Sequence, residues 1–399
     1  MPENKEEFIR VATTLYKIVW KPNLNGECIK KRVLWNNETL RQDYGKDYIG
    51  TVPKYDGFCT VPDHVNYQPI VSDKFLNRYE QIDHKPEQGE FPCIQSLVKH
   101  IFGEQYELGM DYLQLLYLQP VQKLPVLLLV SEERNTGKST FLNFLKALFQ
   151  DNVTFNTNED FRSQFNSDWA GKLLIMVDEV LLNRREDSER LKNLSTTLSY
   201  KVEAKGKDRD EISFFAKFVL CSNNEYLPVI IDAGETRYWV RKISSLEKDD
   251  TNFLQKLKDE TPAFLYHLLH RILTTQKESR MWFDPKLTHT SALQKIIRSN
   301  RNRLEIELSE LILDIMDSVG IDSFSFCLND VIPLLINTQV KVEKHQVRKV
   351  VQECWKLAPA INTLTYTTYQ LDYTQQCHYL SVKKTGRFYT VTKKQLAEL

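Results

Sequence analysis

The chain has 399 residues, of which 42% are hydrophobic, and its 53 Lys and Arg residues balance 53 Asp and Glu residues. The length predicts two or three soluble domains, and the charge balance excludes nucleic-acid binding through the field of the whole protein, so any such site must be a local patch. No apolar run reaches membrane-spanning length and the first residues do not resemble a secretory signal, which argues against a membrane partner. The seven cysteines include no Cys-x-x-Cys pair, which argues against disulfides and zinc.

The sequence of residues 1–123 predicts two regions, neither of which contains a recognisable set of catalytic residues. Residues 1–75 alternate short β-like runs with turn residues, which predicts a β-rich N-terminal region of the α+β class. Its tyrosines and tryptophans are interpreted as core residues, because large aromatics are more often core than a surface that stacks bases. Residues 76–123 carry apolar residues at helical spacing and are predicted to form a helical collar or adapter.

A phosphate-binding loop is predicted between a buried strand and an amphipathic helix. Leu124 to Val130 is a short apolar run, and the helix is expected to begin near Lys138. Gly137 lets backbone N–H groups close on phosphate oxygens, Lys138 reaches the outer phosphates, and the hydroxyl of Ser139 can ligate magnesium. The N-terminus of the helix adds its positive end.

One position of this loop departs from the usual pattern. Five residues before the pair Gly137-Lys138, where the pattern has glycine, the chain has Glu132. The alternative interpretation is therefore a surface turn between a core strand and a helix. The glutamate is compatible with bound phosphate only if its side chain points away.

A second apolar run, which begins at Gly171, ends in the acids Asp178 and Glu179. An aspartate in this place can hold magnesium through water, and the next glutamate can polarise an attacking water. An Asp-Glu pair is also common wherever a strand enters a loop. Its position downstream of the phosphate loop favours the joint interpretation as a nucleotide site.

A helix and two β runs are predicted next, joined at a tip that contains Lys205 and Lys207 around a glycine. A lysine-bearing tip suits close approach to a phosphate backbone without reading bases. Charged hairpin tips are usually just solvated, so DNA contact and simple solvation both remain open.

A further buried strand ends in the amides around Asn223, and two arginines follow at Arg237 and Arg241. Asn223 is placed to hydrogen-bond the γ-phosphate or the attacking water, although an Asn-Asn turn is a frequent alternative. Either arginine is a candidate finger for the nucleotide of a neighbouring subunit. An arginine beside an aromatic residue is otherwise a cation–π pair.

The rest of the chain is predicted to be mainly helical. Amphipathic helices up to residue 280 suggest a lid, so the nucleotide domain is assigned to residues 124–280, and residues 281–303 are expected to be a linker. Residues 304–399 predict three helices and then β runs with a turn at Lys384–Arg387, which suggests a winged-helix-like domain. Periodicity does not choose between duplex DNA and a protein as its partner.

The order of these motifs resembles superfamily 3 helicases, and more closely the helicase part of phage and poxvirus-type primase-helicases. The similarity covers roughly residues 70–275, and the segment Asn135-Thr-Gly-Lys-Ser-Thr140 matches the phosphate loop of that family. The resemblance implies an α/β fold with an AAA+-like P-loop ATPase core that binds ATP and Mg²⁺. It also implies a ring, usually a hexamer, that tracks along single-stranded DNA in the cytoplasm, with a separate primase or polymerase as a further partner. For a phage or mobile element this would be the cytoplasm of a bacterial host.

The resemblance also assigns roles to individual residues. Glu179 would be the catalytic base, Asn223 the polar sensor and Arg237 the arginine finger that acts in trans. Lys205 and Lys207 would be the pore-hairpin residues that grip DNA. The magnesium ligands would be Ser139 and Asp178, and the nucleotide would be bound by Asn135, Thr136, Gly137, Lys138, Ser139 and Thr140.

Two other functions compete with an ATP-dependent helicase or translocase. A small-molecule P-loop kinase shares the Gly-Lys-Ser turn, but it needs neither paired acids for activating water nor a lysine-tipped hairpin. The second is a nucleotide-gated DNA-binding or assembly module in which Glu132 marks a loop with degenerate hydrolysis. The presence of the lysine, hydroxyl, acids, asparagine and arginine together favours the working ATPase.

Overall fold

The computed structural model describes residues 7–22, 28–163, 169, 171–182, 184–202, 210–232, 234–246, 250–300, 303–337, 343–372 and 378–398. The chain divides into two compact units, the first with Met1–Ile230 and Glu235–Leu293, the second with Ile231–Gly234 and Gln294–Leu399. The division falls inside the segment expected to be a linker. Within the described ranges no helix combines the length and apolar character needed to cross a membrane.

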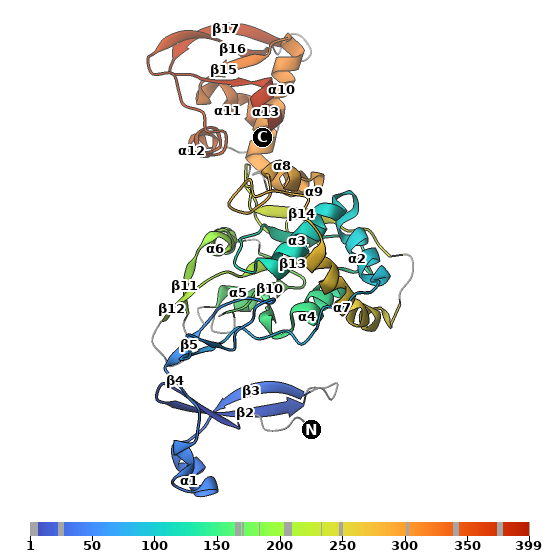
Figure 1. Ribbon diagram of the computed structural model, residues 1–399. Helices are drawn as coiled ribbons and strands as arrows, with labels where there is room; N and C mark the ends of the chain where they lie inside the picture. Colours follow the sequence, from blue (N-terminus) through green and yellow to red (C-terminus); the bar gives the residue numbers. More distant parts are fainter. Residues whose placement is uncertain are drawn as a thin grey trace. The chain divides into compact units, whose positions relative to one another are not determined.

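A five-stranded parallel sheet lies at the centre of the first unit, so the protein is a mixed α/β protein (Figure 1). Its strands run in the order β14-β8-β13-β10-β9. Every residue of β8, β10 and β13 is buried, as expected for strands covered on both faces. The bounds of the five strands are β8 Val126–Val130, β9 Val153–Phe155, β10 Leu174–Val177, β13 Lys217–Ser222 and β14 Tyr238–Lys242.

The strand order fixes where a ligand can bind. The chain leaves β8 through helix α4 (Lys138–Phe149), crosses to the edge strand β9, returns through β10 and β13, and then passes to β14 on the other side of β8. A sheet in which connections depart in opposite directions from neighbouring strands leaves a crevice at the carboxyl ends of those strands. The ends of β8, β10 and β13 are therefore the expected binding edge.

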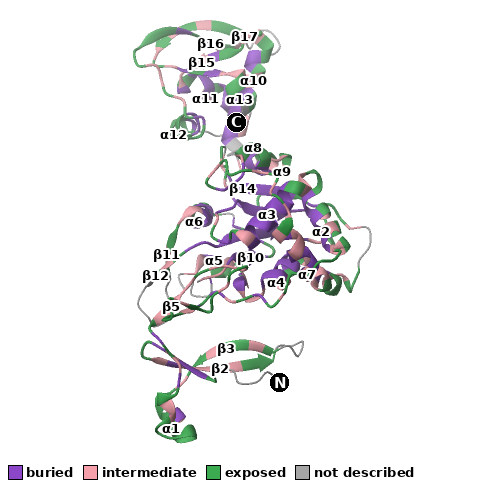
Figure 2. Cartoon of the chain, in the orientation of Figure 1, coloured by how far each residue is buried: buried purple, intermediate pink, exposed green. Residues whose placement is uncertain are grey.

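One face of the sheet shares a hydrophobic core with four helices. Leu127, Met176 and Val219 belong to the same buried cluster as residues of α2 (Pro92–Phe102), α3 (Tyr106–Leu118), α4 and α7 (Phe253–His270). Figure 2 shows α3 and the strands of the sheet as largely buried. The helical segment expected to be a collar thus packs directly on the sheet.

The opposite face carries α5 (Asn158–Arg162) and α6 (Arg185–Thr196), which an ion pair between Arg162 and Asp187 joins at 2.8 Å. Phe161 of α5 packs edge-on against Phe218 of β13. After α6 the chain forms the antiparallel ribbon of β11 (Ser199–Val202) and β12 (Asp210–Ser213). Lys205 and Lys207 lie in the connection between these strands, outside the described residues.

Helix α7 differs from the sequence-based expectation of separate helices, because it continues through Pro262. Proline lacks the N–H that an interior helical residue donates, and packing on a shared core offsets this loss. Phe264, Leu265 and Leu268 are fully buried in the cluster that also contains the sheet.

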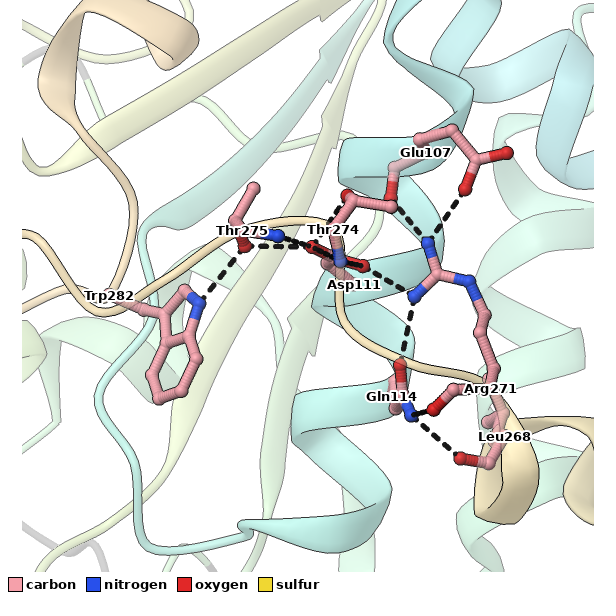
Figure 3. A network of polar contacts seen from close by, with 8 residues as sticks. All are labelled: Glu107, Asp111, Gln114, Leu268, Arg271, Thr274, Thr275 and Trp282. Carbon is pink, nitrogen blue, oxygen red and sulfur yellow. Dashed lines mark hydrogen bonds and ion pairs between the residues drawn. The ribbon is translucent and has the colours of Figure 1, made fainter.

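A buried carboxylate joins α3 to the end of α7 (Figure 3). Asp111 is 0% exposed and pairs with Arg271. It also accepts hydrogen bonds from the backbone N–H and the hydroxyl of both Thr274 and Thr275, at 2.7 to 3.2 Å. Arg271 in turn donates to Gln114 at 2.8 Å. Every charge in this cluster is compensated, as a buried ionic group requires.

The first unit also holds two small sheets in its N-terminal part, several short helical turns, and the helices α8 and α9, of which α9 crosses the division into the second unit. The strand orders are β3-β2-β1-β4 and β5-β7-β6. The bounds are β1 Phe8–Val11, β2 Thr14–Pro22, β3 Cys28–Leu34, α1 Asn37–Tyr44, η1 Tyr48–Gly50, β4 Lys54–Tyr55, β5 Gly57–Cys59, β6 Ile70–Val71, β7 Phe75–Asn77, η2 Gly103–Gln105, η3 Gln150–Asn152, α8 Pro285–Thr288 and α9 Ser291–Ser299.

The second unit combines helices with two antiparallel strand pairs, β15 with β18 and β16 with β17. Strand β17 continues through Lys384 to Gly386, where the sequence had predicted a turn, because the Lys384 ammonium pairs with Asp330 at 2.7 Å and its backbone pairs with β16. The bounds are α10 Arg303–Val319, β15 Ser323–Phe326, α11 Leu328–Asn337, α12 Lys344–Lys349, a π-helical turn Val350–Cys354, β16 Leu364–Asp372, β17 His378–Gly386, β18 Tyr389–Thr392 and α13 Lys393–Glu398.

Removal of the buried carboxylate should strongly destabilise the first unit. We expect Asp111→Ala to lower the free energy of unfolding by about 3 to 5 kcal/mol, because Arg271 loses its fully buried ion-pair partner and two backbone N–H groups lose their acceptor inside the protein. Urea unfolding followed by tryptophan fluorescence measures the loss. The control is Asp259→Ala on the exposed face of α7, expected within about 0.5 kcal/mol of wild type. Equal unfolding midpoints for the two variants would contradict the structural role of Asp111.

Candidate nucleotide site

The loop between β8 and α4, predicted to bind phosphate, contains two residues in the left-handed backbone region. Gly137 is the N-cap of α4 and has a φ of +77°, a left-handed conformation that favours glycine. Asn135 also has a positive φ, of +52°. Gly137 has no side chain to accept from the first amides of α4, so these amides and the positive end of the helix are available to an anion.

Glu132, the residue that departs from the usual loop pattern, has an exposed side chain. Its backbone N–H donates to Glu225 Oε1 at 3.3 Å. Glu225 is 2% exposed and also pairs with Lys242 at the end of β14, at 3.1 Å. The start of the loop is thus anchored to a buried carboxylate, and the glutamate side chain is not packed inside the loop.

Two neighbouring segments hold the middle of the loop. His100 of α2 lies with its Nε2 3.0 Å from the carbonyl oxygen of Thr136. On the other side, the N–H of Leu246 donates to the carbonyl of Asn135 at 2.8 Å, and the N–H of Ser245 donates to Glu133 Oε2 at 3.0 Å. The loop is therefore fixed between the helical layer and the segment after β14.

Lys138 is buried at the base of this loop, with 6% of its surface exposed. Its Nζ donates to Thr136 Oγ1 at 3.0 Å. Burial lowers the pKa of this lysine, and the nearby Cys221, Asp178 and Glu225 act in the opposite direction. A desolvated ammonium group in this place gains much from a phosphate partner, since the interaction is screened less than at the surface.

Ser139 and Asp178 meet across the crevice. The Ser139 hydroxyl donates to Asp178 Oδ2 at 2.8 Å, which joins the start of α4 to the end of β10. Hydroxyl and carboxylate oxygens are the hard ligands that Mg²⁺ prefers, and Mg²⁺ commonly keeps several waters in addition to one or two protein ligands. The donor set therefore fits magnesium. Among the described residues no group of three or more His, Cys, Asp or Glu side chains is arranged as a metal site.

Glu179 is held in a particular backbone conformation beside this pair. Its φ is +57°, which is uncommon for a residue with a side chain and is often found at functional sites. Asn158 donates to the carbonyl of Glu179 at 3.3 Å and accepts from the N–H of Leu181 at 3.0 Å. Asn223 Nδ2 donates to the Glu179 carboxylate at 3.4 Å. The ends of β9, β10 and β13 thus position one carboxylate.

The arginines lie at opposite ends of β14. Arg237 precedes this strand at the amino edge of the sheet, and its carbonyl accepts from the N–H of Val126, the first residue of β8. It lies roughly 15 Å along the strands from the phosphate loop, at about 3.3 Å per residue. Its guanidinium pairs with Glu235 at 2.7 Å. Arg241 lies near the carboxyl edge but pairs with Glu104 at 2.7 Å.

The structure thus brings together Lys138, Ser139, Asp178, Glu179 and Asn223, whereas Arg237 lies apart from them in the same chain. Of the remaining predicted loop residues, Asn135 and Thr136 hold the loop through their carbonyls, Gly137 provides its left-handed turn, and Thr140 is half-buried in the first turn of α4.

Sequence reasoning missed three residues that position the site: His100, Asn158 and Glu225. Asn158 had a partial signal, because it lies shortly after β9, at the start of α5, whereas Asn223 follows β13 directly. Glu225 and His100 had none, since each reaches the loop from a distant part of the chain.

Comparison with known sequences gives a partial match. A protein-family model described as a family of unknown function, DUF5906, matches residues 129–241, which span the parallel sheet from within β8 to within β14. The matched segment is less than half of the chain. A search of curated proteins found no match.

Comparison with solved structures identifies a shared fold. The apo structure of the C-terminal region of NrS-1 aligns with a TM-score of 0.58 and 16% identity, covering 88% of this chain and 84% of that one. Its A form aligns with a TM-score of 0.55 and 18% identity over the same shares. A JCV helicase aligns over 58% of this chain and 66% of that one with 13% identity and a TM-score of 0.31, which is too low to support an argument. The NrS-1 likeness shows the fold alone.

Proposed function

We propose that the crevice at the carboxyl ends of β8, β10 and β13 binds and hydrolyses ATP, and that the protein is an ATP-dependent DNA helicase or translocase. The observation that carries this proposal is the chain of contacts from Ser139 through Asp178 and Glu179 to Asn223, beside the buried Lys138. A phosphate ligand, a metal ligand pair and a base are needed together for hydrolysis of a phosphoanhydride.

Each residue has a defined task in this reaction. Lys138 and the first amides of α4 bind the β- and γ-phosphates, and Ser139 and Asp178 hold Mg²⁺. When bound, Mg²⁺ neutralises charge on the phosphate oxygens. Glu179 accepts a proton as water attacks the γ-phosphorus and the bond to the ADP oxygen breaks. Asn223 orients the Glu179 carboxylate through the hydrogen bond between their side chains.

The chain segment after Glu179 can couple ATP hydrolysis to DNA binding. It leads through α6 directly into the ribbon of β11 and β12, whose connection contains Lys205 and Lys207. We assign these lysines to the backbone of single-stranded DNA, because lysine side chains contact phosphate without selecting a base. The order of motifs further supports a replication protein of a phage or mobile element that works as a hexameric ring, with a separate primase or polymerase.

A second candidate function is a nucleotide-gated DNA-binding or assembly module that does not hydrolyse ATP. Glu225 engages the backbone N–H of Glu132 at the start of the loop, and the Thr136 hydroxyl engages Lys138. In this module the loop would bind nucleotide without the contacts needed for turnover.

The two candidates are separated by a change at the proposed base. We expect Glu179→Gln to bind ATP as wild type does and to lose about 10² to 10⁴ of the hydrolysis rate, because the amide cannot accept the proton. Lys138→Ala should instead lose nucleotide binding. Binding is measured with a fluorescent ATP analogue and turnover by phosphate release, with Glu186→Gln, an exposed acid on α6, as the control. Normal turnover by Glu179→Gln would show that another group is the base.

Arg237 is proposed to serve the nucleotide of a neighbouring subunit, because it lies far from the site of its own chain. Arg237→Lys keeps a cation beside Glu235 but removes the planar fork that an arginine finger provides. Arg237→Lys alone should lose hydrolysis, but mixed with Glu179→Gln it should regain part of it, since a Glu179→Gln subunit still supplies Arg237 to the intact site of its Arg237→Lys neighbour. Arg280→Ala, at an exposed position, is the control. Mixtures of Arg237→Lys and Glu179→Gln that regain no hydrolysis would contradict the trans role.

A further inference from the structure

The second unit contains a pocket of about 440 Å³ that the nucleotide site does not involve. It is bordered by the start of α11, by α12 with its π-helical turn, and by the connection from β17 to β18. Lys344, Arg348 and Arg387 line it, together with the polar side chains of Asn329 and Gln352. None of the described lining residues is acidic.

Helix periodicity directs one basic stripe into this pocket. Lys344, Arg348 and Gln352 follow each other at intervals of four residues, so they lie on one face of α12 and its continuation. Val347 and Val351 on another face are fully buried in the core of the unit. The buried face fixes the rotation of the helix and thereby the direction of the stripe.

The opposite wall holds Arg387 in a defined place. Its Nε donates to the carbonyl of Ile361 at 3.0 Å. At Gly386 this wall comes close to Cys327, the residue before α11, because a Cβ atom there would lie 3.0 Å from Cys327 Sγ. At the floor of the pocket, Gln352 Nε2 donates to the Tyr389 hydroxyl at 2.8 Å, which joins the two walls.

The charges of this pocket are not compensated by the described residues around it. Lys344 and Arg348 form no ion pair with any residue that the structure describes, in contrast to Lys384, which pairs with the buried Asp330. Three cations that line one pocket from two walls, without an acid among the described lining residues, repel each other. An anion between them removes this repulsion and gains charge-assisted hydrogen bonds from both arginines.

We propose that this pocket binds the phosphate groups of a DNA strand, as a second DNA contact separate from the ribbon of β11 and β12. Arginine pairs with phosphate through two parallel N–H groups, and cations on two walls can contact successive phosphates of one strand. A free nucleotide fits less well, because Tyr389, the aromatic residue among the described lining residues, is only 5% exposed and so offers little ring surface on which a base can stack. The inference extends the proposed function but needs no ATP hydrolysis.

The experiment measures DNA binding by the full chain without ATP. The anisotropy of a short fluorescein-labelled oligonucleotide, single-stranded in one arm and duplex in the other, is followed over a series of salt concentrations. Arg348→Ala and Arg387→Ala are compared with Lys349→Ala, which removes an exposed cation from the same helix outside the pocket. Arg348→Lys tests whether charge alone restores binding.

We expect each arginine variant to bind about tenfold more weakly than wild type in at least one arm. The slope of log K against log salt should fall by about 0.7 for each phosphate of a single strand that the variant no longer binds, or about 0.9 for duplex. Lys349→Ala should remain near wild type, and Arg348→Lys should recover part of the affinity, which shows that the unit is folded. Three results would overturn the proposal. The first is an equal effect of all three alanine variants, and the second is no effect of the arginine variants in either arm. The third is displacement of DNA by AMP at equal phosphate concentration.

Discussion

The parallel pairing of β8 between β13 and β14 determines where the proposed nucleotide-binding residues lie. Because all five strands are parallel and the central ones are buried on both faces, their carboxyl ends open at one edge, and the residues that follow each strand are forced together there. The phosphate loop, the Asp-Glu pair and the polar end of β13 are far apart in the sequence, yet they form one chain of hydrogen bonds for this reason.

The helices around the sheet do more than cover it. α2, α3, α4 and α7 complete one hydrophobic core with the sheet, and the buried Asp111 cluster secures the end of α7 to α3. This layer also carries His100, which contacts the phosphate loop directly. Backbone conformations that are uncommon for residues with side chains, at Asn135 and Glu179, are thereby maintained by packing and hydrogen bonds from several elements rather than by local sequence.

Sequence patterns predicted the parts of the site that local chemistry determines. Gly137, Lys138 and Ser139 were predicted from a Gly-Lys-Ser segment between an apolar run and an amphipathic helix, and Asp178, Glu179 and Asn223 from polar residues that follow apolar runs. Glu225 and His100 were not predictable, because their contacts arise only when distant segments fold together. The same holds for the position of Arg237, which follows from strand direction, and for the continuity of α7 through Pro262, which core packing decides. Lys205 and Lys207 lie outside the described residues, so their contact with DNA remains a prediction.

The site at the carboxyl ends of the strands is proposed to hydrolyse ATP and thereby drive movement along DNA. Steady-state ATP hydrolysis by the purified full chain with Mg²⁺, measured in the presence and absence of single-stranded DNA, tests this proposal without any substitution in the protein. We expect hydrolysis that single-stranded DNA stimulates. Nucleotide binding without hydrolysis at any protein concentration, with or without DNA, would refute the motor and favour a module that only switches on nucleotide binding.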